Sequence, residues 1–564
     1  MSLRVDRTSI IHAEPVGVAK GPGDTPHQYT LISSDREQRL KNGEFVYYNA
    51  HADGQPRRIL GRITRREPVK LFPDSFLADP AIAPDDLARA LGYVQAEREL
   101  FELAVTVLGY YDPGLGAFIN PRVSPSCGWS VFLAEDELLR DTLSKKVPGS
   151  PGSARIGSLL SRPDGEVPVV LDVREFTSTH MAIIASTGSG KSYLAGVLIE
   201  ELMSGANKAA VLVIDPHGEY GTLRELPNTP ALADRSRLSD YRPAARVLRP
   251  EHIRVKLSTL EYPDLRYLLP TMTERMEDLL SRAFARVEAN RAWALGELEV
   301  KIQQVADERR DGQGVDYSMT ADGHCRRLDS MLGKAPFSTN EDLDLRDLLR
   351  PGQCSVLQLD DIDEKRQQVI TATLLRRLYR ARQRTVRGET SPGQDEYIPY
   401  PVFVLLEEAH HFAPAGGDAI STGILKQVLA EGRKFGLGVG LISQRPGKLD
   451  ADVLSQCMTQ FIMKVVNPID QASIASAVES ASRDILDELP ALSKGQVIVS
   501  GNSMNAPVLC RVRQRHTQHG GVSMDAPTEW NRWFEADAIR ARERDDSLLR
   551  TSGPRGRRSL YGSE

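Results

Sequence analysis

The segment from His180 to Met203 constrains the fold of this chain more than any other part of the sequence. An apolar run typical of a strand, Met181 to Ala185, is followed by the turn STGSGKS and then by a run typical of a helix. A strand, a glycine-rich turn and a helix in this order form a cradle for phosphate groups, because backbone N–H groups at the helix start face the anion. The segment predicts an α/β domain that binds a nucleoside triphosphate.

Two side chains of this loop have predicted chemical roles. Lys191 supplies a point charge for the β- and γ-phosphates, and Ser192 supplies a hydroxyl ligand for Mg²⁺. Ala185 stands where the usual pattern G-x-x-x-x-G-K-[ST] has its first glycine, and a Gly/Ser loop with a chance lysine is the alternative interpretation. The predicted contacts with ATP and its Mg²⁺ are made by Thr187, Gly188, Ser189, Gly190, Lys191, Ser192 and Tyr193.

The composition is that of an ordinary globular protein, with 41% hydrophobic and 26% charged residues over 564 positions. Neither an apolar run of about 18 residues nor a signal-peptide pattern occurs, so we expect a cytoplasmic protein without a membrane anchor. The formal net charge of −5 does not by itself require a nucleic acid partner. A surface that binds a polyanion would have to be local, such as a pore lined by a few Lys and Arg side chains.

The sequence divides into six predicted regions. Short strand-like runs separated by turn residues are typical of a small β-barrel near the N-terminus. Later, apolar residues at helical spacing occupy one long stretch, and apolar strands alternate with helices, as in a parallel sheet covered on both faces. The regions are a β-barrel at 1–72, an extension at 73–153, the first part of the α/β core at 154–270, a helical insertion at 271–349, the second part of the core at 350–515 and a tail at 516–564.

Two adjacent carboxylates, Glu407 and Glu408, follow the apolar strand Val402 to Leu406. The carboxyl ends of parallel strands form the edge where ligands of α/β sheets sit, so both acids are expected near the phosphate loop. We assign Glu407 to the metal ion, together with Ser192, and Glu408 to the attacking water. The alternative is that the two acids only stabilise the positive end of the following helix.

Three further residues are candidates for the same site. Asp215 ends another apolar strand and can face the nucleotide, although Asp-Pro-x-Gly is also a common turn sequence. Gln444 ends a third strand and can sense the γ-phosphate or the water, or only cap that strand. Arg433 lies just before the helix stop at Gly436, where a cation favours the helix dipole; its functional alternative is to reach the γ-phosphate bound by a neighbouring subunit.

The motifs STGSGKS, VIDPHGEY, VLLEEAHHF and EGRKFGLGVGLISQRPGKL, in this order, resemble those of the HerA family of hexameric DNA translocases in the FtsK/HerA superfamily. The runs LKNGEFVYY and ILGRI resemble the N-terminal barrel of that family. The resemblance is strongest from Arg155 to Arg513, vague in the helical insertion and absent after about residue 520. It implies an α/β, RecA-like parallel-sheet P-loop ATPase core with an N-terminal β-barrel and a helical insertion.

The same resemblance implies a functional arrangement. The expected assembly is a homohexameric ring with ATP and Mg²⁺ between subunits and DNA threaded through the central pore. Lys191 and Ser192 would contact phosphate and Mg²⁺, Glu408 would be the catalytic acid, and Arg433 would act on the neighbouring subunit's nucleotide. A nuclease of the NurA type would dock on the barrel side, or the ring would serve a phage-defence effector.

Our leading hypothesis is an ATP-dependent DNA translocase or helicase, with two alternatives. One is a conjugation or secretion ATPase, against which the barrel and the lack of a transmembrane segment argue. The other is a ring scaffold that uses ATP to present an effector subunit, and DNA-stimulated ATP hydrolysis separates it from a motor. In the tail, Trp530, Trp533 and Phe534 pack on a neighbouring subunit or on their own domain, and Arg555, Arg557 and Arg558 bind DNA phosphates or form a solvated end.

Overall fold

The fold is given by a computed structural model of the chain. It describes residues 14–69, 100–233, 240–269, 271–288, 292–313, 317–478, 486–520 and 525–551, apart from positions 24, 26, 36 and 53. The chain divides into two compact units, Met1–Gln518 and His519–Glu564. Within the described residues, no helix is both long and apolar enough to span a membrane.

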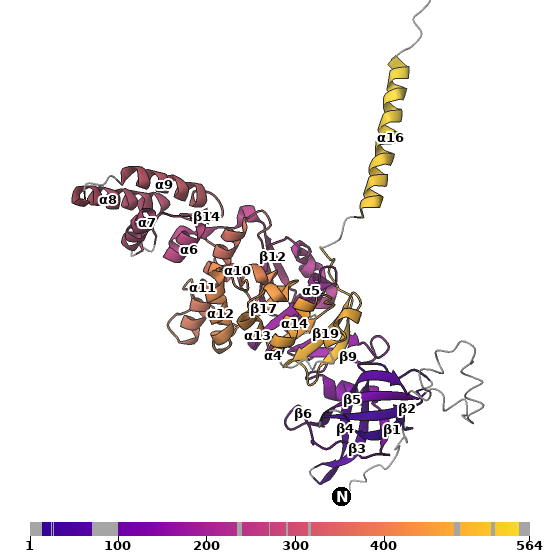
Figure 1. The fold of residues 1–564 in the computed structure, drawn as a ribbon. Coiled ribbons are helices and arrows are strands. Elements are labelled where there is room, and N and C mark those ends of the chain that lie inside the picture. The colour runs from indigo at the N-terminus through magenta and orange to yellow at the C-terminus, as the bar shows by residue number, and fades with distance from the viewer. Residues whose placement is uncertain are drawn as a thin grey trace, which may run out of the picture. The chain divides into compact units, whose positions relative to one another are not determined.

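The N-terminal part of the first unit is a closed antiparallel β-barrel (Figure 1). Six strands pair in the order β2-β1-β7-β3-β4-β5, and the pairing of β5 with β2 closes the ring, while β6 adds to β5. Alternate side chains such as Leu103 and Val105 are buried inside. The strands are β1 (Gly17–Pro22), β2 (Gln28–Ser33), β3 (Phe45–Ala52), β4 (Gln55–Pro68), β5 (Phe101–Asp112), β6 (Ala117–Ile119) and β7 (Ser130–Leu133).

The barrel does not end at the predicted boundary of residue 72. Strands β5 and β7 come from the region predicted as an extension, and each pairs with two strands from the N-terminal part. The pairing of Val18 with Ser130 joins residues that are far apart in the sequence, and local patterns carry no information on such pairs. Residues 73–99 of the predicted extension lie outside the described residues.

The rest of the first unit is built on one large sheet, which is the α/β core. Its strands follow the order β12-β15-β11-β16-β17-β10-β18-β19-β20-β8-β9, parallel from β12 to β18 and antiparallel from β18 to β9. The strands are β8 (Ser153–Leu159), β9 (Pro168–Asp172), β10 (Met181–Ile184), β11 (Ala210–Asp215), β12 (Ala244–Leu248), β15 (Gln353–Gln358), β16 (Val402–Leu406), β17 (Leu437–Ser443), β18 (Thr459–Ile462), β19 (Gln496–Gly501) and β20 (Val508–Val512).

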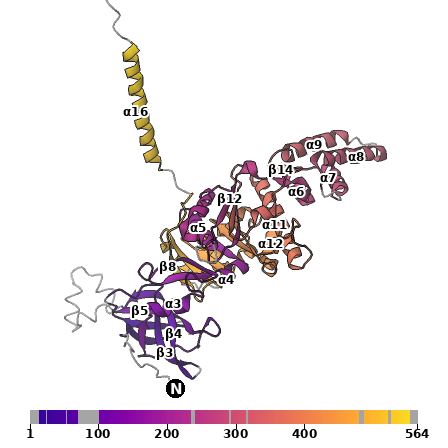
Figure 2. The ribbon, with the colours of Figure 1, turned by 180° about the vertical axis from the view of Figure 1, so that it is seen from behind.

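Helices cover both faces of this sheet, as the apolar strands predicted (Figures 1 and 2). Ile183 and Val213 belong to one hydrophobic core, and their neighbours Ile184 and Ile214 belong to the other, because successive strand residues point to opposite faces. The α/β fold class is therefore confirmed. The first core contains α3 (Asp136–Leu143), α4 (Val173–Ser178) and α5 (Lys191–Leu202); the second contains α11 (Glu364–Val386), α12 (Ile420–Glu431), α13 (Ala451–Ser455) and α14 (Pro468–Ala477).

The predicted helical insertion is a lobe built mainly of helices, together with two short strands. The predicted apolar stripe lies on α7, where Met276, Leu279, Leu280, Phe284 and Val287 are buried. The lobe and its connections to the core contain β13 (Val255–Lys256), α6 (Tyr262–Leu268), α7 (Glu274–Val287), α8 (Leu295–Gln313), α9 (Ser318–Leu332), β14 (Phe337–Ser338) and α10 (Leu345–Leu348).

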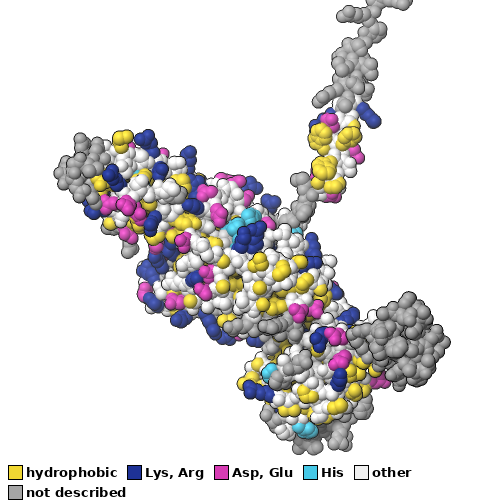
Figure 3. Space-filling view, in the orientation of Figure 1, with side chains coloured by type: hydrophobic (Ala, Val, Ile, Leu, Met, Phe, Trp, Pro, Cys, Tyr) yellow, Lys and Arg dark blue, Asp and Glu magenta, His cyan; other side chains and the backbone are white. Residues whose placement is uncertain are grey.

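The second unit contains one helix, α16 (Ala526–Thr551), within the residues described there. Trp530, Trp533 and Phe534 on this helix are exposed, and Figure 3 shows hydrophobic side chains along it. The basic end predicted at Arg555, Arg557 and Arg558 lies outside the described residues.

Candidate nucleotide-binding site

The glycine-rich loop joins β10 to α5 at the carboxyl edge of the sheet. Gly188 and Gly190 have φ values of +79° and +104°, which a residue with a Cβ rarely adopts. Neighbouring backbone holds the loop in place, since the N–H of Ser186 and the hydroxyl of Ser189 both donate to the carbonyl of Lys464, at 2.9 and 3.2 Å. The loop therefore leads into α5, and the N–H groups in the first turn of this helix lie at the same edge, where they favour an anion.

The side chain of Lys191 lies between the two carboxylates that follow β16. Its ammonium group contacts Glu407 and lies 2.9 Å from Glu408, and its side chain is only 6% exposed. Glu407 is fully buried and accepts a second hydrogen bond, of 2.8 Å, from the hydroxyl of Tyr220. Strands β10 and β16 are not adjacent in the sheet, because β17 lies between them. Lys191 and the two acids, which were predicted from separate motifs, nevertheless meet at one edge of the sheet.

The two carboxylates differ in their acidity. Burial raises the pKa of Glu407 to about 7, in spite of the neighbouring ammonium of Lys191. Burial acts on Glu408 too, but Lys191 outweighs it and the pKa of Glu408 lies below its ordinary value. Burial also opposes the charge on Lys191, yet the two carboxylates together raise its pKa. Near neutral pH, Lys191 and Glu408 are charged while Glu407 titrates, so adjacent acids are prepared for different roles.

Gln444 connects Glu408 to the glycine-rich loop. Its side-chain amide and its backbone N–H both donate to the carboxylate of Glu408, the latter at 3.4 Å, and its side-chain oxygen accepts a 2.5 Å hydrogen bond from Thr187. The backbone of Glu408 has φ +48° and ψ +51°, a left-handed conformation that costs a non-glycine residue energy. Strain of this kind is typical of residues whose position matters for function.

Asp215 does not face the open edge as the sequence analysis expected. Its side chain is fully buried, and its two oxygens accept the backbone N–H groups of Glu219 and Tyr220 at 3.1 and 2.9 Å. Burial raises its pKa to about 6. In this arrangement Asp215 shapes the turn, which was the alternative interpretation of Asp-Pro-x-Gly.

The same turn contains two site residues that the sequence analysis did not select. The hydroxyl of Ser192 donates to the carboxylate of Glu219, not to Glu407, and Tyr220 donates to Glu407. Glu219 and Tyr220 lie four and five residues after Asp215, which ends β11. The available signal was therefore their place in the run DPHGEY, while their contacts depend on a turn geometry that the sequence does not reveal.

Arg433 and Tyr193 lie apart from this network. Arg433 is exposed on a short 3-10 turn (Gly432–Phe435) before β17 begins, and within the described part of the chain it has no ion pair. Gln444 follows the other end of β17, and a strand of 7 residues spans about 20 Å. Tyr193 is turned toward the backbone N–H of Arg515, at 2.8 Å. Arg433 thus cannot reach the Lys191 of its own chain.

The oxygen donors at the loop suit Mg²⁺ only in combination with a nucleotide. Among the described residues, no group of three or more His, Cys, Asp or Glu side chains could hold a metal ion. Mg²⁺ is commonly bound through one or two protein oxygens, phosphate oxygens and waters. The hydroxyl of Ser192 and the nearby carboxylates of Glu219 and Glu408 are hard oxygen donors of that kind. The donor set fits a magnesium ion that arrives on a triphosphate.

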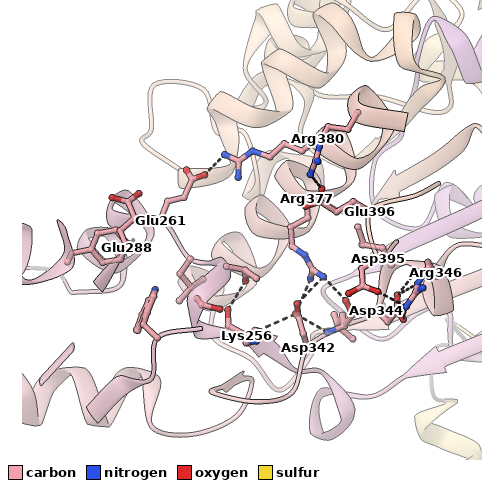
Figure 4. A pocket seen from close by; sticks show the side chains of 18 residues that line it. Lys256, Glu261, Glu288, Asp342, Asp344, Arg346, Arg377, Arg380, Asp395 and Glu396 are labelled. Carbon is pink, nitrogen blue, oxygen red and sulfur yellow. Dashed lines mark hydrogen bonds and ion pairs between the residues drawn. The ribbon is translucent and has the colours of Figure 1, made fainter. Parts of the chain in front are cut away.

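A second dense group of charges lies between the insertion and α11, around a pocket of about 770 Å³ (Figure 4). Its side chains are paired with one another: Arg377 with Asp342 at 2.9 Å, and Arg380 with Glu261 at 2.6 Å. We call these four residues, with the neighbouring pair Arg376 and Asp264, the insertion joint. Because acids and bases alternate there, the pocket offers no cradle for a phosphate chain.

The chain is similar to known proteins over most of its length. Residues 154–378 match the family model described as Helicase HerA, central domain. The chain is 28% identical to the DNA double-strand break repair helicase HerA of Pyrococcus furiosus, over 92% of this chain and 97% of that protein. It is 25% identical to the protein of the same name from Sulfolobus acidocaldarius, over 89% and 94%.

Among solved structures, VirB4 of Thermoanaerobacter pseudethanolicus is similar with a TM-score of 0.44 and 14% identity, over 65% of this chain and 97% of that chain. The family-model match includes the phosphate loop, and the two acids after β16 lie beyond its end at residue 378. These comparisons support a HerA family ATPase of the FtsK/HerA type.

Proposed function

We propose that this chain is an ATP-dependent DNA translocase or helicase that works as a homohexameric ring. The observation that carries the proposal is the position of Lys191 between Glu407 and Glu408, with Arg433 at the opposite edge of the same sheet. The names of the relatives from Pyrococcus furiosus and Sulfolobus acidocaldarius, DNA double-strand break repair helicases, support DNA as the substrate.

Each residue of the site has a place in ATP hydrolysis. The ammonium of Lys191 and the N–H groups at the start of α5 bind the phosphates. Glu408, which stays ionised, accepts a proton from the attacking water, and Gln444 couples its position to Thr187 in the loop. When bound, Mg²⁺ neutralises phosphate charge, and Ser192 offers it a ligand. Glu407 contacts Lys191 and so helps to position its ammonium group. Its role as a metal ligand stays a prediction.

The distance between Arg433 and the phosphate loop argues for an assembly. A cation at the start of β17 serves a triphosphate only if that nucleotide is bound by another subunit. A closed ring gives every nucleotide one such arginine and encloses a pore for DNA. We further propose that a nuclease, or a defence effector, docks on the barrel side of this ring.

Mixing two inactive variants tests the shared site. Glu408→Gln removes the acid that a subunit contributes to the ATP it binds itself. Arg433→Ala removes the cation that a subunit contributes to the ATP bound by its neighbour. Each variant alone should bind ATP and hydrolyse it at least about 100-fold more slowly than the wild type. Rings reassembled from both variants should regain activity, because some interfaces then join an intact Glu408 to an intact Arg433. Lys434→Ala, the adjacent exposed cation, is the matched control and should hydrolyse ATP normally.

The outcomes separate the candidate functions. Normal hydrolysis by Arg433→Ala, or mixtures that stay inactive although the subunits exchange, would contradict the shared site. Addition of duplex DNA to the wild type should stimulate hydrolysis. An active ring that DNA does not stimulate would instead favour the scaffold that presents an effector subunit.

A further inference from the structure

The turn after β11 connects the two halves of the nucleotide-binding site. Consecutive side chains point to different partners: Glu219 accepts the hydroxyl proton of Ser192, and Tyr220 donates to Glu407 at 2.8 Å. The backbone N–H groups of these two residues are both fixed by the buried carboxylate of Asp215. This one turn therefore contacts Ser192 directly and Lys191 through Glu407.

The turn is held on its outer side as well. Gly218 has φ +72°, and its carbonyl accepts a 3.3 Å hydrogen bond from the side chain of Gln358 on the neighbouring strand β15. A Cβ at Gly218 would lie 3.2 Å from the carboxylate of Asp360. These contacts leave the turn little freedom, so the carboxylate of Glu219 is presented to Ser192 by a rigid frame.

We propose that Glu219 is a positioning residue for the magnesium side of the site, and this inference rests on the proposed function. A serine hydroxyl has one proton and two lone pairs, and it binds a cation through a lone pair. Its proton must then point to an acceptor on another side. Glu219 supplies that acceptor, which orients the oxygen of Ser192 and increases its negative charge.

The competing carboxylates are committed elsewhere. Glu407 is fully buried and shared between Lys191 and Tyr220, and Glu408 accepts from Lys191 and Gln444. Glu219 is half-buried, and its carboxylate accepts from Ser192. The hydroxyl of Ser192 thus depends on a residue of the turn after β11 rather than on the acids after β16.

The effect of Mg²⁺ on nucleotide affinity tests this role without requiring turnover. A fluorescent ATP analogue is titrated with wild type and variants in Mg²⁺ and in EDTA. In Glu219→Ala, the gain in affinity caused by Mg²⁺ should fall by about tenfold, with little change in EDTA, because a hydrogen bond to a charged group is lost. Glu219→Gln, which keeps an acceptor oxygen, should retain most of the gain. Glu225→Gln, on the 3-10 helix (Gly221–Asn228) that follows the turn, is the matched control and should behave as wild type.

A double variant shows whether Glu219 acts through the serine. The loss in Ser192→Ala should not grow when Glu219→Ala is added, whereas independent roles would give additive losses. Retention of the full Mg²⁺ gain by Glu219→Ala, equal losses in the Gln and Ala variants, or additivity would each overturn the inference. If the wild type itself failed to bind the analogue, the proposed function would fail instead.

Discussion

The carboxyl edge of the sheet and the insertion joint are both crowded with paired charges, but they differ in burial. At the edge, Lys191 is 6% exposed and Glu407 is not exposed at all. At the joint, Arg380 is 61% exposed and its partner Glu261 35%. Solvent screens the second pair and not the first. Charge density alone therefore does not identify a functional site.

Two other properties separate these regions. Burial at the edge raises the pKa of Glu407 to about 7, and the adjacent Glu408 has a left-handed backbone. The edge also collects residues from the tips of β11, β16 and β17, where ligands of α/β sheets are bound. The joint only connects the insertion to α11 (Figure 4). Perturbed acidity and strain at convergent strand tips are what indicate chemistry there.

The largest expected contrast is in nucleotide affinity. Lys191→Ala removes the phosphate-binding cation and leaves Glu407 and Glu408 without their partner, so affinity for an ATP analogue should fall by about 100-fold or more. Arg380→Ala, which removes a cation of the joint, should change affinity less than about twofold, because its pair is exposed. Equilibrium titration of the two variants measures both effects. Equal losses would mean that the joint belongs to the nucleotide site.

Much of this contrast could be predicted from the sequence, because strand tips follow from a local pattern. The apolar runs before Glu407 and Gln444 end where parallel strands end, and parallel strands share a carboxyl edge. The phosphate loop around Lys191 was predictable for the same reason. In the structure, Lys191 contacts Glu407, and Gln444 donates to the adjacent Glu408.

Other features depend on long-range geometry that the sequence does not carry. The role of Glu219 depends on how Asp215 closes a turn, and the closure of the barrel depends on pairing β1 with β7. The antiparallel extension of the sheet from β18 to β9 was likewise not predicted from the sequence. The proposed role of Arg433 depends on a neighbouring subunit, so neither the sequence nor the fold of one chain contains its partner.

The insertion joint itself contains a smaller version of the same contrast. Arg376 and Arg380 lie one helical turn apart on α11, but Arg376 pairs with the fully buried Asp264, whose pKa burial raises. Arg376→Ala should lower the free energy of unfolding of the insertion by about 3 kcal/mol, since it leaves a buried acid without its cation. Arg380→Ala should lower it by less than about 1 kcal/mol. Urea unfolding followed by the fluorescence of the buried Trp293 measures both. Similar losses in the two variants would show that burial does not determine how much these ion pairs stabilise the fold.

The pH dependence of stability gives the smallest and most specific test of the edge. The pKa of Glu407 is raised from its ordinary 4.5 to about 7, so the folded chain holds its proton more tightly than the unfolded chain does. The resulting stabilisation is complete below pH 4.5 and is lost as the pH rises toward 7.

Glu407→Gln cannot titrate at this position, so its stability should fall less than that of the wild type between pH 5 and 7. The expected difference is about 1 to 3 kcal/mol, measured by chemical unfolding at several pH values. Asp215, whose raised pKa of about 6 acts in the same direction, remains in the variant and should leave a residual slope. Glu261→Gln at the exposed joint is the matched control and should keep the wild-type slope. A parallel pH profile for wild type and Glu407→Gln would show that burial at the edge does not perturb this acid, and the distinction between the two charge clusters would then rest on geometry alone.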